Sequence, residues 1–113
     1  MKFEIVLINF PFDNLSETKL RPALCLTEPL SKYRHIIFAP ITSNLNNATE
    51  NTDLIIENTA VDFDKTGLKV SSVIKLHRLI TASDSIIQKT IGVLPIPYHI
   101  NVYDKLKLLF SIS

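Results

Sequence analysis

Short apolar stretches separated by polar loops occupy most of the chain, and this pattern predicts a protein built mainly of β-strands. The stretches are rich in β-branched residues and are bounded by Pro, Asn, Asp and Ser, which is typical of strands. The expected strands are 4–10, 22–27, 35–41, 53–57, 71–76 and 90–94. Pro40 interrupts the third strand, so we expect that end to be a sheet edge or a bulge.

The periodicity changes near residue 97, where apolar residues begin to recur at helical spacing. The apolar positions are Ile100, Tyr103, Leu106, Leu109 and Phe110. They predict a closing amphipathic helix with Pro97 in its first turn, and residues 83–85 can cap a separate helical turn. The expected fold is therefore a small, strongly bent antiparallel sheet or barrel with a C-terminal helix, in one domain over residues 1–113.

Composition narrows the class of protein. Hydrophobic residues make up 46% of the chain, so it can bury a core and is not intrinsically disordered. Apolar runs are all shorter than the roughly 20 residues of a membrane span, and Glu4 is an acid where a signal peptide carries none, so we expect a cytoplasmic protein. With 2 glycines, the chain lacks the glycine-rich phosphate-binding loops of nucleotide enzymes.

Positive charge is concentrated in the second half of the chain, whereas the possible metal ligands are scattered along it. Residues 65–113 carry most of the lysines and few acids, which is compatible with a basic face for a polyanionic partner. The histidines, His35, His77 and His99, fall on separate predicted elements, and Cys25 lies in an apolar run typical of a small buried hydrophobe. We therefore expect no metal site and no cofactor.

Arg21 precedes Pro22, and this dipeptide is the first candidate site. Proline forces the residue before it into an extended conformation, so the Arg21 backbone is fixed where a loop meets a strand. A guanidinium held in this way suits a phosphate because it is planar, always charged and able to donate two parallel hydrogen bonds. The alternative is a strand-end arginine paired with a surface acid such as Glu17.

Thr42, Ser43 and Asn44 form the second candidate site, at the end of the most apolar predicted strand. Two hydroxyls and an amide can hydrogen-bond an anion or the edge of a base. Alternatively, these residues only turn the chain.

Basic residues follow Gly67 and form a third candidate region. Lys69 and Lys75 supply part of the positive charge of this half of the chain. On a strand, Lys75 and His77 would share one face. A solvated charged surface is the ordinary explanation for such residues.

Taken in chain order, several short motifs resemble the MazF/PemK family of toxin endoribonucleases. They are residues 5–12 (IVLINFPF), 21–26 (RPALCL), 39–43 (APITS), 67–68 (GL) with 72–74 (SVI), and 91–94 (IGVL). The motifs are individually degenerate, but together they keep the order and spacing of the family over nearly the whole chain.

The resemblance implies an SH3-like barrel of the PemK/CcdB type with a C-terminal helix, usually as a homodimer. It implies a growth-inhibiting toxin, an mRNA interferase that cleaves single-stranded RNA at specific sequences without a metal or cofactor. It also implies a cognate antitoxin as partner, whose flexible segment occupies the RNA groove and with which the toxin binds DNA.

The resemblance also assigns roles to residues. The family's catalytic arginine precedes a proline and matches Arg21, and its catalytic threonine follows an apolar strand and matches Thr42. Some members place an essential acid in the loop before the arginine, for which Glu17 is the candidate. The expected RNA contacts are Lys19, Ser43, Asn44, Lys69, Ser72 and Lys75.

Three other functions stay open at this point. A DNA gyrase inhibitor of the CcdB type shares the fold, as would an inactive family member kept as a binding module or a barrel without a ligand. A gyrase inhibitor would need neither Arg21 nor Thr42 and would bind through the end of its last helix. Residues 108–113 are apolar here, and we expect them to be packed rather than exposed.

Overall fold

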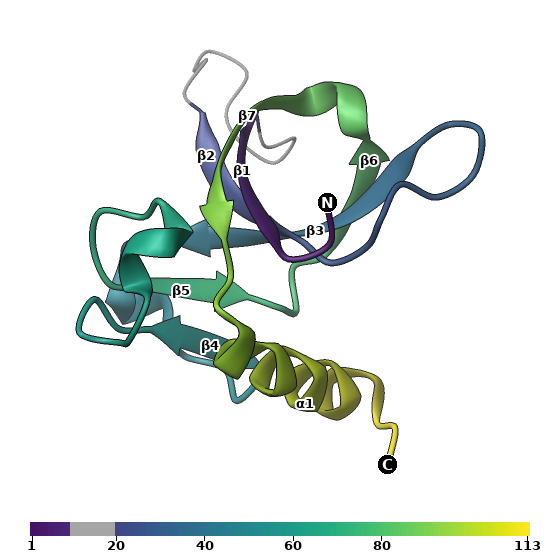
Figure 1. Ribbon diagram of the computed structural model, residues 1–113. Helices are drawn as coiled ribbons and strands as arrows, with labels where there is room; N and C mark the ends of the chain where they lie inside the picture. The colour runs from purple at the N-terminus through teal and green to yellow at the C-terminus, as the bar shows by residue number, and fades with distance from the viewer. Residues whose placement is uncertain (10–19) are drawn as a thin grey trace.

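The computed structural model describes residues 1–9 and 20–113, in which seven antiparallel strands form one sheet and a helix follows near the C-terminus (Figure 1). The strands are β1 (Glu4–Ile8), β2 (Arg21–Cys25), β3 (His35–Thr42), β4 (Asp53–Ile56), β5 (Ser72–Lys75), β6 (Ile80–Ser83) and β7 (Ile87–Val93). The helix is α1 (His99–Phe110), and the 3₁₀ helices are η1 (Leu45–Asn47), η2 (Phe63–Thr66), η3 (Asp84–Ile86) and η4 (Ile96–Tyr98). The predicted mainly β architecture with a closing helix is confirmed.

Strand β3 lies in the middle of the sheet, whose order is β4-β5-β3-β2-β1-β7. On one side β3 pairs with β2; on the other it pairs first with β6, over residues 35–38, and then with β5, at residues 41–42. The expectation that Pro40 marks a sheet edge is wrong. Pro40 lies in the interval where β3 leaves β6 and joins β5, so its missing N–H falls where that ladder is interrupted.

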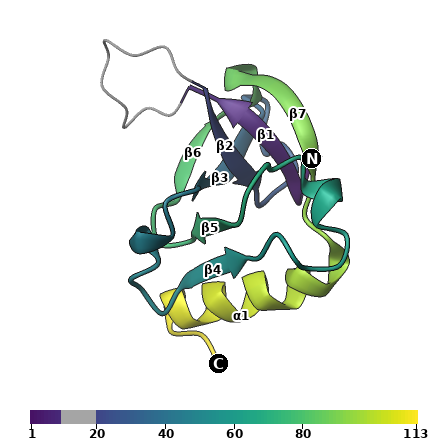
Figure 2. The same ribbon diagram turned by 90° about the vertical axis from the view of Figure 1, so that its left-hand side faces the viewer.

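Apolar side chains pack on both faces of the sheet because successive residues of a strand point to opposite sides. One cluster lies between the sheet and α1, which runs beneath β4 (Figure 2). The second cluster fills the curved part of the sheet and comprises Val6, Ile8, Ala23, Cys25, Ile36 and Phe38. In β2, Ala23 belongs to the second cluster and its neighbour Leu24 to the first, so this strand is buried on both sides.

Both glycines of the chain lie where η2 packs against β7. Gly67 ends η2 with a φ of 73°, and a Cβ there would overlap the backbone oxygen of Ile91. A Cβ on Gly92 would overlap the backbone oxygen of Thr66. The hydroxyl of the buried Thr66 also accepts a hydrogen bond from the Leu68 N–H at 3.0 Å. The close approach of the two backbones at Gly67 and Gly92, together with this hydrogen bond, fixes the segment that leads from η2 to β5.

Two local features predicted from the sequence, the Ser83 cap and the place of Pro97, are found in the structure. Ser83 caps η3, its hydroxyl accepting from the Ser85 N–H at 3.1 Å, as the sequence predicts. Pro97 lies in η4, immediately before α1. Strand β6 is not among the expected strands, and β7 begins three residues earlier than expected. None of the helices in the described part of the chain is long and apolar enough to cross a membrane.

The end of α1 differs from the expectation of packing. Leu108, Phe110 and Ile112 are 50%, 57% and 61% exposed, and the fully buried residue of the helix is Val102, near its start. Because only the first part of α1 is covered by the sheet, the apolar C-terminal residues stay on the surface.

Candidate functional site

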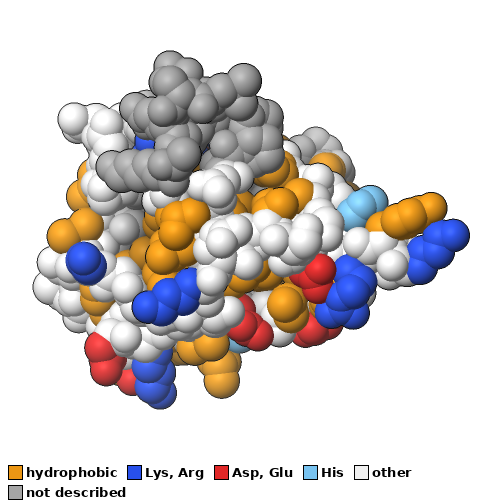
Figure 3. Space-filling view, turned by 90° about the horizontal axis from the view of Figure 1, so that it is seen from above, with side chains coloured by type: hydrophobic (Ala, Val, Ile, Leu, Met, Phe, Trp, Pro, Cys, Tyr) orange, Lys and Arg blue, Asp and Glu red, His pale blue; other side chains and the backbone are white. Residues whose placement is uncertain are grey.

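A cavity of about 1290 Å³ lies where the ends of β2 and β3 meet β5, β7 and the segment after η2. Its lining residues come from segments far apart in the sequence, from Leu7 to Ile91. Figure 2 shows how the bent sheet brings β2, β3 and β5 together. On the face seen from above in Figure 3, basic side chains lie beside apolar ones. Polar and charged side chains make up more than half of the lining residues, with Arg21, Lys69 and Lys89 among the cations. A hollow with convergent polar groups of this kind is a candidate ligand site.

Arg21 and Thr42 both line this cavity. Arg21 is the first residue of β2 and pairs with Ile8 of β1, which sets its backbone extended as Pro22 requires. The β2–β3 ladder pairs Ala23 with Pro40, and continuing its register by two residues sets Arg21 opposite Thr42 on one face of the sheet. The structure therefore brings together the two candidate residues that the sequence separates.

Thr42 and Asn44 shape the turn that follows β3. The Thr42 hydroxyl accepts a hydrogen bond from the Asn44 N–H at 3.1 Å, and Oδ1 of Asn44 accepts from the Asn46 N–H at 3.1 Å to cap η1. A hydroxyl that accepts can still donate its own hydrogen. Thr42 can thus turn the chain and also donate to a ligand, so the two interpretations of this segment are compatible.

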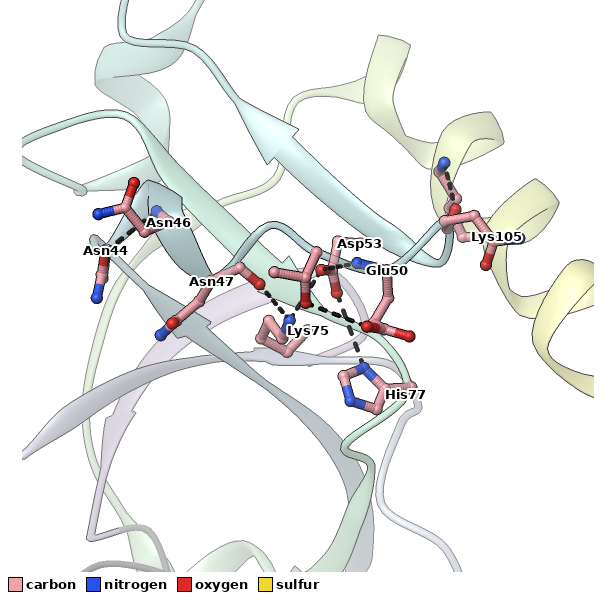
Figure 4. Close-up of polar contacts among 10 residues, drawn as sticks. Asn44, Asn46, Asn47, Glu50, Asp53, Lys75, His77 and Lys105 are labelled. Atoms are coloured by element: carbon pink, nitrogen blue, oxygen red, sulfur yellow. Dashed lines mark hydrogen bonds and ion pairs between the residues drawn. The ribbon is translucent and has the colours of Figure 1, made fainter.

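Lys75 and Asp53 form a buried ion pair at the side of the cavity (Figure 4). The ammonium nitrogen lies 2.8 Å from Oδ2 of Asp53 and 2.5 Å from the backbone oxygen of Asn47, and the two side chains are 9% and 2% exposed. Oδ2 of Asp53 also accepts from the Glu50 N–H at 3.0 Å. The ammonium of Lys75 is thus engaged with Asp53 and with the loop between β3 and β4, and its contact with RNA stays a prediction.

The surroundings of Asp53 act on its carboxylate in opposite directions. Burial raises its pKa, whereas the hydrogen bonds from Lys75 and from the Glu50 N–H, together with the charges of Lys75 and His77, lower it. The net result holds the pKa of Asp53 below its ordinary value, so the carboxylate is ionised at neutral pH.

The other expected RNA-binding residues differ in accessibility. Ser43, Asn44 and Lys69 are exposed, and Ser43 and Lys69 line the cavity. Ser72 also lines it but is buried, with its hydroxyl donating to the Val70 backbone oxygen at 2.9 Å. Glu17 and Lys19 lie outside the described residues.

Cys25 is a buried free cysteine, as its apolar surroundings predict. Burial is the main cause that raises the pKa of its thiol, to about 12. Because the thiolate is the reactive form, Cys25 is a packing residue of the second core cluster rather than a nucleophile.

Asp53 and Lys89 are neighbours of the site that no sequence pattern indicates, and His77 was expected only as a histidine on the same face as Lys75. His77 Nδ1 lies 3.8 Å from Oδ1 of Asp53, and both His77 and Lys89 line the cavity. Lys89 is brought there by the pairing of β7 with β1, in which it lies opposite Leu7. Strand β5 ends at Lys75, so His77 lies in the turn that follows rather than on the strand. The common partner of Lys75 and His77 could be found only from the β4–β5 register, which pairs Asp53 with Lys75.

The amino-acid sequence of the chain matches one known protein family. A sequence profile of the PemK-like, MazF-like toxins of type II toxin-antitoxin systems matches residues 1–110. No protein of curated function matches the chain.

Two solved structures share the fold at low sequence identity. The Mycobacterium tuberculosis toxin MazF-mt6 is 19% identical with a TM-score of 0.73, over 97% of this chain and 98% of that one. An endoribonuclease in complex with its cognate antitoxin from mycobacterial species is 7% identical with a TM-score of 0.70, over 100% and 94% of the two chains.

Proposed function

The chain belongs to the PemK-like, MazF-like family of toxins of type II toxin-antitoxin systems, and we propose that it is an endoribonuclease that cleaves single-stranded RNA at specific short sequences. The observation that carries this proposal is the common position of Arg21 and Thr42 on one cavity wall, opposite each other when the β2–β3 register is continued. A guanidinium and a hydroxyl side by side can bind two oxygens of one phosphate.

The proposed reaction uses the 2′-hydroxyl of the substrate as the nucleophile. This oxygen forms a bond to the adjacent phosphorus while the bond from phosphorus to the 5′-oxygen of the next nucleotide breaks. Because the nucleophile is already tethered, much of the entropic barrier is absent. The products are a 2′,3′-cyclic phosphate and a free 5′-hydroxyl.

Arg21 stabilises the additional negative charge that develops on the phosphorus oxygens, which is often the largest single contribution to catalysis. Thr42 donates its hydroxyl hydrogen to a non-bridging oxygen of the same phosphate. Its own oxygen is held by the Asn44 N–H, so the hydroxyl is oriented before the substrate binds.

In this proposal the exposed residues around the cavity select the RNA substrate. Sequence-specific proteins usually read RNA where bases are unpaired, and the exposed Ser43 and Asn44 offer hydrogen-bonding groups for base edges. Lys69 is the exposed cation for a backbone phosphate. We also propose that the protein is a cytoplasmic homodimer neutralised by a cognate antitoxin, on the strength of the family to which it belongs.

Incubation of the purified protein with a pool of single-stranded RNAs in excess chelator tests this function. We expect cleavage that leaves a 2′,3′-cyclic phosphate and a 5′-hydroxyl. Arg21→Ala should reduce cleavage by about 10²-fold or more, while Lys107→Ala, an exposed change on α1, should cut normally. Intact RNA for every sequence, or gyrase inhibition without RNA cleavage, would contradict the proposal.

A further inference from the structure

We propose that His77 is the general base of the cleavage reaction and that Asp53 is its positioning residue. This inference rests on the proposed function and deepens it, because Arg21 and Thr42 account for charge stabilisation and leave the proton of the 2′-hydroxyl without an acceptor. His77 lies on the wall of the same cavity, in the turn that follows β5.

The first observation is an unsatisfied oxygen on Asp53. Oδ2 of this carboxylate is saturated by Lys75 and the Glu50 N–H, but Oδ1 is buried and has no hydrogen-bond partner among the residues that the structure describes. The side chain is 2% exposed. A buried carboxylate oxygen without a donor is costly, so its presence calls for a group that completes it.

The second observation is the position of the His77 ring. Its Nδ1 lies 3.8 Å from Oδ1 of Asp53, which is close enough for an ion pair and slightly long for a hydrogen bond. Catalytic hydrogen bonds are often long before the substrate is bound and shorten in the complex. The His77 side chain is 37% exposed, whereas that of Asp53 is 2% exposed, so the proposal requires the histidine to make the adjustment that closes this distance.

This arrangement selects one tautomer of the imidazole. With its Nδ1–H directed at the ionised Asp53, the neutral ring carries its lone pair on Nε2. Figure 4 shows Nε2 of His77 on the side of the ring away from Asp53. A carboxylate that orients an imidazole in this way also stabilises the imidazolium formed when the base accepts a proton.

The proposed step balances as follows. The proton of the 2′-hydroxyl moves to Nε2 of His77 as the 2′-oxygen bonds to phosphorus, and the bond from phosphorus to the 5′-oxygen breaks. The leaving 5′-oxygen takes a proton from water, and the imidazolium afterwards returns its proton to water. Nothing is oxidised or reduced, and the enzyme ends in its starting state.

Charged groups near His77 come from several elements. The acids are Asp53 on β4 and Glu50 in the loop before it, and the cations are Lys75 on β5 and Arg78, the next residue in the chain. The further cavity cations are Arg21, Lys69 and Lys89. Asp53 lies within ion-pair distance of Nδ1, at 3.8 Å, so its removal should disturb the position of the ring.

The test compares kcat and kcat/KM between pH 5 and 9 for the wild type and six variants, Glu50→Gln and Arg21→Ala among them, on one RNA that the wild type cuts. His77→Gln should lose about 10²–10⁴-fold in kcat and with it the acid limb of the profile. Asp53→Asn should lower kcat with little change in KM, because the imidazole loses the carboxylate that positions it. His35→Gln, on β3, should behave as the wild type. Added imidazole should partly restore cleavage by His77→Ala.

The outcomes separate this inference from the proposed function. Normal cleavage by His77→Gln with an unchanged pH profile, while Arg21→Ala is inactive, overturns the role of His77 and leaves the nuclease intact. If the fall of kcat at low pH disappears in Glu50→Gln and persists in His77→Gln, the base is Glu50 and the role of His77 is overturned. A wild type that cuts no RNA overturns both. Because His77 is partly exposed, thermal unfolding of its variants should match that of the wild type, and if Asp53→Asn fails to fold, the two His77 variants decide.

Discussion

Lys75 and Asp53 lie directly opposite each other on β5 and β4, and their charged groups meet at 2.8 Å beside the cavity. The pair joins the second half of the sheet to the loop after β3, since Lys75 also donates to the Asn47 backbone oxygen. One buried contact therefore supports both the sheet and the turn that carries Thr42.

Removing one partner of this pair should be strongly destabilising. Lys75→Met leaves the Asp53 carboxylate buried without its cation, and breaking a buried pair in this way costs about 3–5 kcal/mol. Urea denaturation followed by circular dichroism measures the free energy of unfolding. Lys69→Met, the exposed control, should stay within about 0.5 kcal/mol. The double variant Asp53→Leu with Lys75→Met should regain most of the loss, and equal stability of the two single lysine variants would contradict the role of the pair.

Stability should also fall in acid because of Asp53. Its pKa is lowered in the folded state from the ordinary value of 3.8, so its contribution is fully present above that value and is lost as the pH falls through the lower folded-state pKa. The difference in unfolding free energy between the wild type and Lys75→Met should therefore shrink between about pH 5 and pH 2. A difference that stays constant over this range would show that Asp53 does not depend on Lys75 for its ionisation.

Arg21 should not be replaceable by lysine. Arg21→Lys keeps the charge but loses the planar pair of donors, so we expect cleavage to stay at least about tenfold below the wild type. Single-turnover cleavage of one RNA measures the effect on the chemical step. Full activity of Arg21→Lys would mean that charge alone is sufficient at this position.

Thr42 should be needed for its hydroxyl rather than its shape. Thr42→Val, which has the same outline, should lose about 10²-fold in kcat, and Thr42→Ser should lose far less. Near-UV circular dichroism checks the fold of both variants, because the Thr42 hydroxyl also holds the Asn44 N–H. Equal activity of the valine and serine variants would remove Thr42 from the mechanism.

Gly92 should tolerate no side chain. A Cβ there overlaps the backbone oxygens of Lys65 and Thr66, and overpacking of this kind costs about 1–3 kcal/mol. Gln88→Ala, an exposed change on the same strand, is the control. Thermal unfolding compares the two, and a Gly92→Ala protein as stable as the control would show that η2 can move away from β7 at little cost.

Local structure was predictable where the cause is local. The strands around 4–8, 35–42 and 53–56, the Ser83 cap and Pro97 before the last helix all follow from residue types and spacing. Strand β6 was missed because its apolar and polar residues alternate weakly and its pairing with β3 stabilises it from outside. The position of Pro40 in a central strand depends on two other strands meeting there.

The site was predictable only in part for the same reason. Arg21 and Thr42 were expected to converge through a family resemblance, and the β2–β3 register supplies the physical cause. The burial of Lys75 and its contact with Asp53 depend on a cross-strand pairing that no local pattern reveals, so Lys75 was expected to be an exposed cation.

Pairing between β1 and β7 joins residues at the two ends of the fold, and this has a consequence for synthesis. Strand β1 leaves the ribosome first but obtains its second neighbour only when residues 87–93 have emerged. The cavity wall that contains Lys89 and Ile91 cannot exist before then. The cavity is therefore complete only when β7 has paired with β1, so any activity that depends on this wall begins after that pairing.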